Sequence, residues 1–469
     1  MRIVFTHGYF LYEDEKEQQI MKPYPPLGLQ YVSAYLEENG FPNAVFDTTF
    51  STFESLQSFL EKEPPALLGI YTNLMTKLNV LRIIRLVKDS PALQATRIVL
   101  GGPEVRHHKE HFLRYGADII AFGEGEATML ELARHFDAGG NMELAHIPGI
   151  AYLDAAGQVS TTGERPFLAD LDELPLPGRE KIPLQQYFDA WRQHHGYSML
   201  SMSTMRGCPY GCKWCSRAVY GKSYRRRSPA KVAEELAWLK ARYDFDKIWF
   251  VDDVFTINHR WLREFARLVQ ENGLVTPYEA ISRADRMNEE VIQLLRDSGC
   301  FRIWIGAESG AQRVLDAMNR MVEAEKVSEM IQLAQQYGIE AGSFIMLGYP
   351  GETEEDIRTT LRFLKQSRPD HFTLTVAYPI KGTPLYEEVE GRFLENLPWE
   401  SSTDRDIEFE RPYPRAYYNH AMNWIQREMA SLKQRRDGRR MAALRTKAAA
   451  LRSRLGMAVE KRMGKVRRG

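Results

Sequence analysis

Three of the four cysteines in this 469-residue chain lie within eight residues of one another. Cys208, Cys212 and Cys215 have the spacing C-x3-C-x2-C, and Cys300 lies far from them along the chain. Thiolates are soft ligands that hold iron–sulfur clusters. Three of them would leave one iron of a [4Fe–4S] cluster without a protein ligand, and an open coordination position is what catalysis requires. The glycines and the proline in this loop allow it to fold back so that the three sulfurs converge.

Other uses of these cysteines fit the pattern less well. A zinc site usually combines C-x2-C pairs with further Cys or His ligands, and no such partner pair is visible. A disulfide is disfavoured because three of the four cysteines are crowded and the N-terminus does not resemble a secretory signal. Buried thiols would account for one or two of the positions but not for the spacing. We expect Cys300 to be a structural thiol.

With Trp214 before the last cysteine, this stretch resembles the radical S-adenosylmethionine (SAM) superfamily, whose signature is C-x3-C-x-aromatic-C. The resemblance implies that Cys208, Cys212 and Cys215 are the metal ligands and catalytic centre, and that SAM chelates the fourth iron through its amino and carboxylate groups. One electron from the cluster would then cleave SAM to methionine and a 5′-deoxyadenosyl radical. Trp214 is expected to lie near SAM.

Repeated strand–helix units surround the cysteine loop between residues 196 and 395. The helices are expected to begin at Pro229, Arg260, Asn288, Ala311 and Thr353. The apolar runs predict six strands, at residues 197–204, 247–251, 278–282, 302–305, 343–347 and 372–377. Six such units predict a partial (β/α)6 barrel with its active site at the carboxyl ends of the strands.

Polar and glycine residues follow these strands and are the candidate SAM ligands. Asp252 and Asp253 follow the second strand, and carboxylates suit the ammonium or ribose hydroxyls of SAM; which of the two makes the contact is left open. Arg283 follows the third strand and would meet the SAM carboxylate or the substrate. By the resemblance, Glu308 belongs to a G-x-E-S segment near SAM, and Gly348 to a glycine–proline stretch around the adenosyl group.

The first 150 residues have a different strand–helix pattern. Strands are predicted at residues 2–6, 44–47, 66–71, 97–100 and 118–122, and helices at residues 27–38, 53–61, 77–88, 109–114 and 127–136. This alternation predicts a flavodoxin-like, doubly wound parallel sheet with helices on both faces. Ligands of such sheets bind beyond the carboxyl ends of the strands.

Small residues at those strand ends are the candidate cofactor ligands of this domain. They are Thr72, Gly101, Gly102, Gly123 and Gly125. Glycines let the backbone approach a bulky ligand, although ordinary turns of a structural domain would look the same. Such a domain followed by a radical SAM core resembles the cobalamin-binding radical SAM class, which includes methyltransferases and the anaerobic cyclase of bacteriochlorophyll synthesis. The resemblance implies that these residues contact cobalamin.

One position departs from the wider cobalamin pattern. Classical cobalamin proteins carry the motif D-x-H-x-x-G, whose histidine replaces the lower ligand of cobalt. We align that motif with residues 47–52, which places Thr49 where the histidine would be. Cobalt without a histidine below it should give up a methyl group more readily.

The remaining segments are a connection and a basic tail. Residues 151–195 are expected to connect the two domains, beginning with a hairpin, and residues 396–469 to form a helical region. From residue 427 to the end, fifteen Lys and Arg residues face three Asp and Glu, so this part carries +12 and the rest −12. Met441, Leu444, Ala448, Leu451, Leu455 and Ala458 form one apolar stripe. We expect a helix packed on its own protein, while a partner helix or an anionic membrane surface are alternatives.

Composition sets further limits. No apolar run reaches the roughly 18 residues of a membrane span, and reduced thiols with an oxygen-sensitive cluster indicate the cytoplasm. The run from Arg225 to Arg227 is expected to be a solvated helix start rather than a nucleic-acid site.

By resemblance, the main prediction is a cobalamin-dependent radical SAM enzyme that methylates an unactivated carbon of a small-molecule or lipid-like substrate. A flavodoxin or ferredoxin would be its reductant. A ring-forming or oxidising cyclase is the second prediction. A non-catalytic iron–sulfur carrier or sensor is the third, although it would leave the polar strand ends unexplained.

Overall fold

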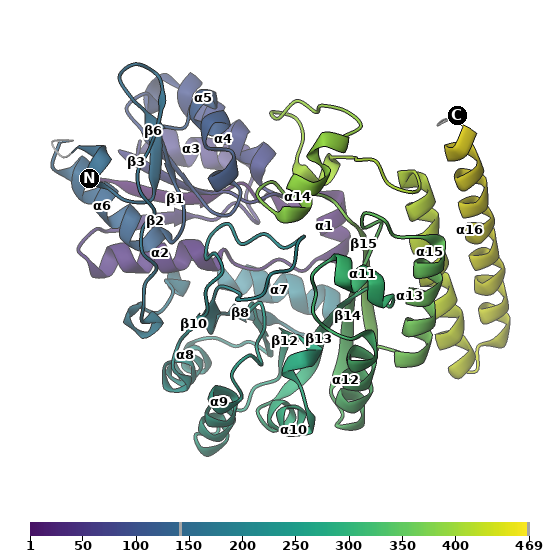
Figure 1. The fold of residues 1–469 in the computed structure, drawn as a ribbon. Helices are drawn as coiled ribbons and strands as arrows, with labels where there is room; N and C mark the ends of the chain where they lie inside the picture. Colours follow the sequence, from purple (N-terminus) through teal and green to yellow (C-terminus); the bar gives the residue numbers. More distant parts are fainter. Residues whose placement is uncertain (140–142, 467–469) are drawn as a thin grey trace.

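The computed structural model describes residues 1–139 and 143–466. Two parallel sheets, each covered by helices, lie with a cavity between them, and a pair of long helices forms one edge of the molecule (Figure 1). The predicted α/β fold class is therefore confirmed. None of the described helices is both long and apolar enough to cross a bilayer.

The first sheet has the strand order β2-β1-β3-β4-β5-β6-β7. Its first five strands are parallel and have the order of flavodoxin-like sheets. The predicted hairpin after residue 149 is present, but it joins this sheet as two antiparallel edge strands instead of standing in a separate connection. The strands are β1 (Ile3–His7), β2 (Asn43–Phe46), β3 (Leu67–Tyr71), β4 (Arg97–Gly101), β5 (Ile119–Ala121), β6 (Ile150–Leu153) and β7 (Val159–Thr161).

Helices cover both faces of this sheet, which explains why all five residues of β1 and the first four of β3 are buried. Five of the six helices match the predicted ones within two residues, and the short α1 has no counterpart in the prediction. The helices are α1 (Glu15–Ile20), α2 (Leu27–Glu38), α3 (Phe53–Lys62), α4 (Lys77–Asp89), α5 (Lys109–Tyr115) and α6 (Gly125–Asp137).

The second sheet has the order β15-β14-β13-β12-β11-β8, with every pair parallel. Because β8 and β15 do not pair with each other, the barrel is open, as predicted for a partial (β/α)6 barrel. The strands are β8 (Met199–Met202), β11 (Lys247–Phe250), β12 (Tyr278–Ser282), β13 (Cys300–Glu308), β14 (Glu340–Leu347) and β15 (His371–Val376).

The helices of the barrel differ from the prediction in two places. The helix expected from Ala311 is divided into a short α11 and a separate α12, and α7 lies in the segment predicted as a connection. Cys300 is buried at the start of β13, in agreement with a structural thiol. The helices are α7 (Leu184–His195), α8 (Pro229–Arg242), α9 (His259–Glu271), α10 (Glu289–Asp297), α11 (Gln312–Ala317), α12 (Ala324–Gln336), α13 (Glu354–Ser367) and α14 (Pro384–Val389).

The chain ends in two antiparallel helices, α15 (Arg415–Arg436) and α16 (Arg440–Val466), at the edge of the molecule beyond β15 (Figure 1). The expectation that α16 packs on its own protein is correct, but the face is not the predicted one. Ala443, Ala450 and Met457 are buried, whereas the apolar stripe that includes Leu444 and Leu455 faces solvent. Small residues allow the two helices to approach closely, since a Cβ at Gly456 would lie 2.7 Å from the His420 ring.

Candidate cluster and cofactor site

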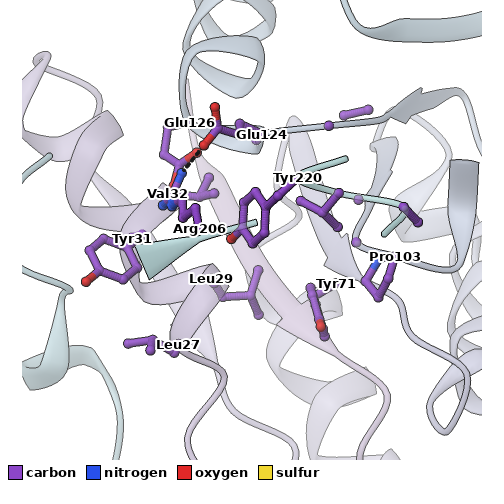
Figure 2. A pocket seen from close by; sticks show the side chains of 18 of the residues that line it. Leu27, Leu29, Tyr31, Val32, Tyr71, Pro103, Glu124, Glu126, Arg206 and Tyr220 are labelled. Atoms are coloured by element: carbon purple, nitrogen blue, oxygen red, sulfur yellow. Dashed lines mark hydrogen bonds and ion pairs between the residues drawn. The ribbon is translucent and has the colours of Figure 1, made fainter. Parts of the chain in front are cut away.

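A cavity of about 420 Å³ lies between the two sheets and is the centre of the candidate site. The strand ends and loops of the first domain form one wall, and the cysteine loop forms the other (Figure 2). Its lining includes Leu27, Leu29, Tyr31, Val32, Tyr71, Gly101, Gly102, Pro103, Gly123, Gly125, Met129, Met205, Cys208, Cys215, Tyr220 and Asp253. The cavity thus joins residues that the sequence analysis assigned to two different cofactors.

Four of the five predicted cobalamin residues line this cavity, namely Gly101, Gly102, Gly123 and Gly125. A Cβ at Gly101 would meet only the carbonyl oxygen of Ala121 at 3.8 Å, so this glycine leaves open space beside the backbone. Gly102 has a different role, because its φ of +106° and a Cβ position 2.3 Å from the Thr72 carbonyl oxygen require glycine for the turn. Thr72 itself is buried outside the cavity lining.

The structure does not support the interpretation of Thr49. Thr49 lies outside the cavity lining, and its hydroxyl forms a hydrogen bond with the Tyr187 hydroxyl, 2.7 Å away. Tyr187 donates its proton to Asp47, whose other oxygen contacts His7 at 2.9 Å. This network links β1, β2 and α7 behind the cavity. The alignment with D-x-H-x-x-G is therefore wrong, and Thr49 carries no information about a ligand below cobalt.

The three predicted cluster ligands lie on the loop between β9 (Met205–Arg206) and β10 (Arg225–Arg226), which pair with each other and close the base of the loop. Cys208 and Cys215 line the cavity, and Cys212 is buried. Burial, together with nearby Asp253, raises the pKa of Cys215 to about 12. Bound iron would have to stabilise the thiolate form, as metals do for cysteine ligands. Among the described residues, no three Cys, His, Asp or Glu side chains are placed to share a single metal ion, which a zinc site would need.

Two buried guanidinium groups lie against Cys212. Arg283 Nη1 is 3.8 Å from its sulfur, and Arg320 Nη1 is 3.9 Å from it. Arg283 is paired with Asp285, whereas Arg320 makes no ion pair within the described part of the chain, and its buried Nε has no hydrogen-bond partner there. A buried cation that makes no direct ion pair is stabilised when an anion binds beside it. The donor set therefore fits an anionic iron–sulfur cluster and the carboxylate of a ligand.

Arg320 was not predicted from the sequence. It follows α11 in a loop without a motif of its own, and only folding brings it to Cys212, 108 residues earlier. The one feature of the sequence that could have pointed to Arg320 is Gly306 on β13. A Cβ there would lie 2.7 Å from Arg320 Nη2 and 2.9 Å from Glu308 Oε1, so glycine allows the two charged groups to approach.

Glu308 is the last residue of β13 and has the left-handed φ of +64°. Such a conformation is uncommon for a residue other than glycine and is often found at functional sites. Burial raises the pKa of Glu308 to about 7, although the guanidinium groups of Arg320 and Arg283 oppose this shift. The carboxyl group is therefore poised between its neutral and charged forms near neutral pH.

The two neighbouring aspartates have different surroundings. Asp252 is buried, accepts hydrogen bonds from the backbone N–H groups of Thr204 and Met205 at 2.7 and 3.2 Å, and lies 3.6 Å from Arg226. It therefore holds the end of β8 and the start of the cysteine loop. Asp253 points into the cavity, and burial followed by repulsion from Asp252 raises its pKa. Of the two, Asp253 has the carboxylate that is open to a ligand.

Of the six predicted SAM residues only Asp253 lines the cavity, and Trp214 and Gly348 lie outside it, as Asp252, Arg283 and Glu308 do. Trp214 packs against a buried apolar cluster that includes Met346 and Tyr349. Gly348 follows β14 with a φ of +74° and donates its N–H to the buried carboxylate of Glu352 at 2.6 Å. The structure thus places both beside the carboxyl ends of the barrel strands, where a role in SAM binding stays a prediction.

Charged residues connect the two walls of the cavity. Arg206, directly before the cysteine loop, donates to Glu124 at 2.8 Å and to Glu126 at 2.5 Å, both at the start of α6 (Figure 2). Arg225 also donates to Glu124, at 2.8 Å. Burial alone would raise the pKa of the Glu126 carboxyl, but Arg206 holds it below its usual value. Tyr31 and Tyr220 lie on either side of the Arg206 guanidinium.

The arginine run from Arg225 to Arg227 is not the solvated helix start that the sequence suggested. The three side chains are at most 12% exposed. Arg226 lies over the Trp261 ring at 3.5 Å, and Arg227 pairs with Glu235. The run is buried because each arginine has a partner on another part of the fold. We refer to Arg206, Arg225, Glu124 and Glu126 as the interdomain clamp.

Family comparisons agree with the two halves of this site. The model of the radical SAM superfamily matches residues 202–364, and that of the B12 binding domain matches residues 20–133. The chain therefore contains a radical SAM domain and a B12 binding domain. The radical SAM match includes the cysteine loop and Glu308, and the B12-binding match includes all four glycines that line the cavity.

Individual relatives match most of this chain. The chain is 29% identical to an uncharacterized methyltransferase of Pyrococcus horikoshii over 81% of its own length and 82% of that protein. It is 25% identical to the anaerobic magnesium-protoporphyrin IX monomethyl ester cyclase of Rubrivivax gelatinosus over 83% and 70%. The fold is similar to that of the radical SAM methyltransferase TsrM from Kitasatospora setae, solved with cobalamin and a [4Fe-4S] cluster bound, with a TM-score of 0.69 and 18% identity over 83% of this chain and 74% of that one.

Proposed function

We propose that the protein is a cobalamin-dependent radical SAM enzyme that transfers a methyl group to an unactivated carbon atom of a small or lipid-like molecule. The observation that carries this proposal is the single cavity with Cys208 and Cys215 on one wall and Gly101, Gly102 and Gly123 on the other. Two cofactors bound to opposite walls of one cavity can act on the same substrate carbon.

Each group of residues has a separate task in this proposal. The cluster and SAM supply a carbon-centred radical when bound, and cobalamin supplies the methyl group. Cys208, Cys212 and Cys215 hold the cluster, and Arg283 and Arg320 compensate negative charge beside Cys212. Glu308 and Asp253 accept hydrogen bonds from the SAM ammonium or ribose, with Trp214 and Gly348 at the edge of the SAM site.

The cobalamin wall binds mainly through shape. Its glycines bring backbone close to the ligand, and Leu27, Leu29 and Tyr71 supply an apolar and aromatic surface. The cavity is apolar and concave, as cofactor sites commonly are.

A cyclase-type oxidation is the alternative, favoured by the similarity to the protoporphyrin cyclase. Methyl transfer is preferred because TsrM and the Pyrococcus relative are both named methyltransferases. A simple electron carrier would not require the second, glycine-lined wall. We further propose flavodoxin or ferredoxin as the reductant and the cytoplasm as the compartment, because the cluster needs a low-potential electron and protection from oxygen.

Anaerobic incubation of the enzyme, reconstituted with iron, sulfide and hydroxocobalamin, with dithionite and SAM tests the proposal. Methyl transfer predicts 5′-deoxyadenosine, methionine and S-adenosylhomocysteine, together with the absorbance of bound corrinoid. 5′-Deoxyadenosine without S-adenosylhomocysteine would favour the cyclase reaction, and neither product would favour the carrier. Cys212→Ala removes a cluster ligand and should abolish all three products, while Cys300→Ala, which changes a buried cysteine outside the site, is the matched control and should keep them.

A further inference from the structure

The outer face of α16 is the largest apolar surface on the described chain that neither the core nor the cavity explains. Six apolar side chains there are between 45% and 68% exposed. They are Met441, Leu444, Leu451, Leu455, Val459 and Met463. At about 100° per residue they occupy roughly 120° of the helix circumference, opposite the buried face formed by Ala443, Ala450, Ser453 and Met457. A helix on a protein surface normally turns polar residues to water, so α16 has the reverse arrangement.

Basic residues lie along both sides of this surface. Arg445 and Arg452 lie on one side, and Arg440 and Arg454 on the other. All four are exposed, and none makes an ion pair within residues 1–139 and 143–466. The neighbouring Lys447 and Lys461 are instead tied to Glu428 and Glu354 at 2.6 and 2.7 Å, which fixes the helix on the body of the protein.

The position of α16 brings this surface near the opening of the barrel. Lys461 contacts Glu354, the first residue of α13, and α13 follows the loop at the carboxyl end of β14. In Figure 1, α16 is the outermost helix at that edge of the molecule, so no other element covers its outer face. A flat partner could therefore reach the full length of the stripe.

We propose that this face of α16 docks the enzyme on an anionic membrane surface. The apolar side chains would insert at the boundary between headgroups and acyl chains, and the long arginine side chains would extend to lipid phosphates. Each basic residue near an anionic leaflet adds to the attraction. A second copy of the chain fits less well, because two such faces would bring arginines against arginines along both edges.

Vesicle binding of the full-length protein, with its cluster and cobalamin reconstituted, tests this proposal. Flotation is measured with two kinds of vesicle, one of phosphatidylcholine alone and one of phosphatidylcholine with about 30% phosphatidylglycerol. The comparison separates a neutral from an anionic surface of similar lipid packing. We expect binding to the anionic vesicles that weakens with added salt, and little binding to the neutral ones. If the protein elutes as a monomer and floats with neither kind of vesicle, the proposal is overturned.

Two variants separate the apolar and the charged contributions. The triple change Leu444→Gln, Leu451→Gln and Leu455→Gln should abolish flotation, and Arg445→Glu, Arg452→Glu and Arg454→Glu should weaken it by roughly 100-fold or more. The matched control, Leu153→Gln, Val275→Gln and Leu394→Gln, alters three exposed apolar residues elsewhere and should bind like the wild type. Unchanged binding by the α16 variants would refute membrane docking. Membrane docking would also be refuted if the wild type formed a dimer and bound no vesicles, and if the Leu→Gln triple variant lost this dimer. That result would assign the face of α16 to a second copy of the chain.

Discussion

The two walls of the cavity are both built from the carboxyl ends of a parallel sheet, yet they differ in the chemistry they present. The wall from the first domain offers glycine backbone, apolar side chains and aromatic rings, and its two carboxylates, Glu124 and Glu126, are neutralised by arginines from the other domain. The barrel side offers thiols, Asp253 and, around Cys212, the charged groups of Arg283, Arg320 and Glu308.

This difference indicates that the same sheet architecture can recognise its ligands in two ways. A large cofactor such as cobalamin is bound by a cavity of the correct shape, so steric changes should affect it most. A small zwitterion such as SAM is bound by charges that have little solvent around them, so changes in charge should affect it most. The interdomain clamp has residues from both walls and fixes the position of one wall relative to the other.

The largest effect is expected from breaking the clamp. Arg206→Met leaves Glu126 buried without its cation, which should lower the free energy of unfolding by about 3–5 kcal/mol. Because the walls would lose their register, the ratio of methylated product to 5′-deoxyadenosine should also fall. Denaturant unfolding and product analysis measure the two effects.

Two further variants show whether charge is the cause. Arg206→Met combined with Glu126→Gln removes the unpaired carboxylate and should recover part of the stability. Arg263→Met, which breaks an exposed pair with Glu290, should hardly change the free energy of unfolding. If Arg206→Met were as mild as Arg263→Met, the clamp would not be what connects the walls.

A steric change on the glycine wall should separate the two cofactors. Gly101→Val projects into free space and does not need a positive φ, so folding should be retained, while cobalamin affinity should fall roughly 100-fold because the side chain occupies the cavity. SAM binding should hardly change. Gly163→Val, at a glycine with no atoms near its Cβ position and outside the cavity, is the control. A loss of SAM binding equal to the loss of cobalamin binding would contradict the steric interpretation.

A charge change on the barrel wall should have the opposite selectivity. Glu308→Gln is expected to weaken SAM binding by about 10- to 100-fold, the value of a hydrogen bond to a charged group, and to leave cobalamin binding unchanged. Because the pKa of Glu308 is about 7, SAM affinity of the wild type should rise from pH 6 to pH 8 as the carboxylate becomes charged. The variant should lose this pH dependence, whereas the exposed-site variant Glu340→Gln should keep it. Calorimetric titration at several pH values measures both.

Local patterns in the sequence were sufficient to predict the fold and the two kinds of domain. The strands of both sheets are apolar runs because they are buried on two faces, and the predicted limits of β3 or β12 differ from the observed ones by at most one residue. The cysteine spacing and the glycines at strand ends are equally local. These features could be predicted because each is determined within a few residues.

What could not be predicted depends on contacts between distant residues. Arg225 was assigned to solvent because nothing near it in sequence indicates Glu124, 101 residues earlier. Arg320 reaches Cys212 only after α11 and its following loop have folded. Thr49 was placed in the cofactor site from a motif alignment, and only the position of Tyr187 shows that it faces away. The neighbouring residues in a single sequence do not indicate which side chain of another domain a residue will contact.

The smallest effect is expected where the first domain buries a carboxyl group that Lys77 compensates only in part, on its outer side rather than in the cavity. Glu104 lies beyond the glycine turn after β4, near His108 and Asp404, and Trp399 of the C-terminal segment packs against the same site. Burial, and then the nearby Asp404, raise the pKa of Glu104 to about 7. The folded state therefore holds a proton that the unfolded state releases near pH 4.5, and the stability that this proton gives is lost as the pH rises through 7.

Glu104→Gln keeps the neutral form at every pH, so its Tm should exceed that of the wild type by a few degrees at pH 8 and match it at pH 5. Thermal unfolding of the protein without cofactors at the two pH values measures the difference. Glu110→Gln, at a fully exposed carboxylate of the neighbouring helix α5, should show no such dependence on pH. An equal response of the two variants would mean that the Glu104 carboxyl is solvated, and that the contact made by Trp399 does not bury charge on this domain. In that case the first domain would make its contacts through packing and not through buried charge, both on its outer side and in the cavity. The difference from the barrel, which buries charged groups around Cys212, would then be larger.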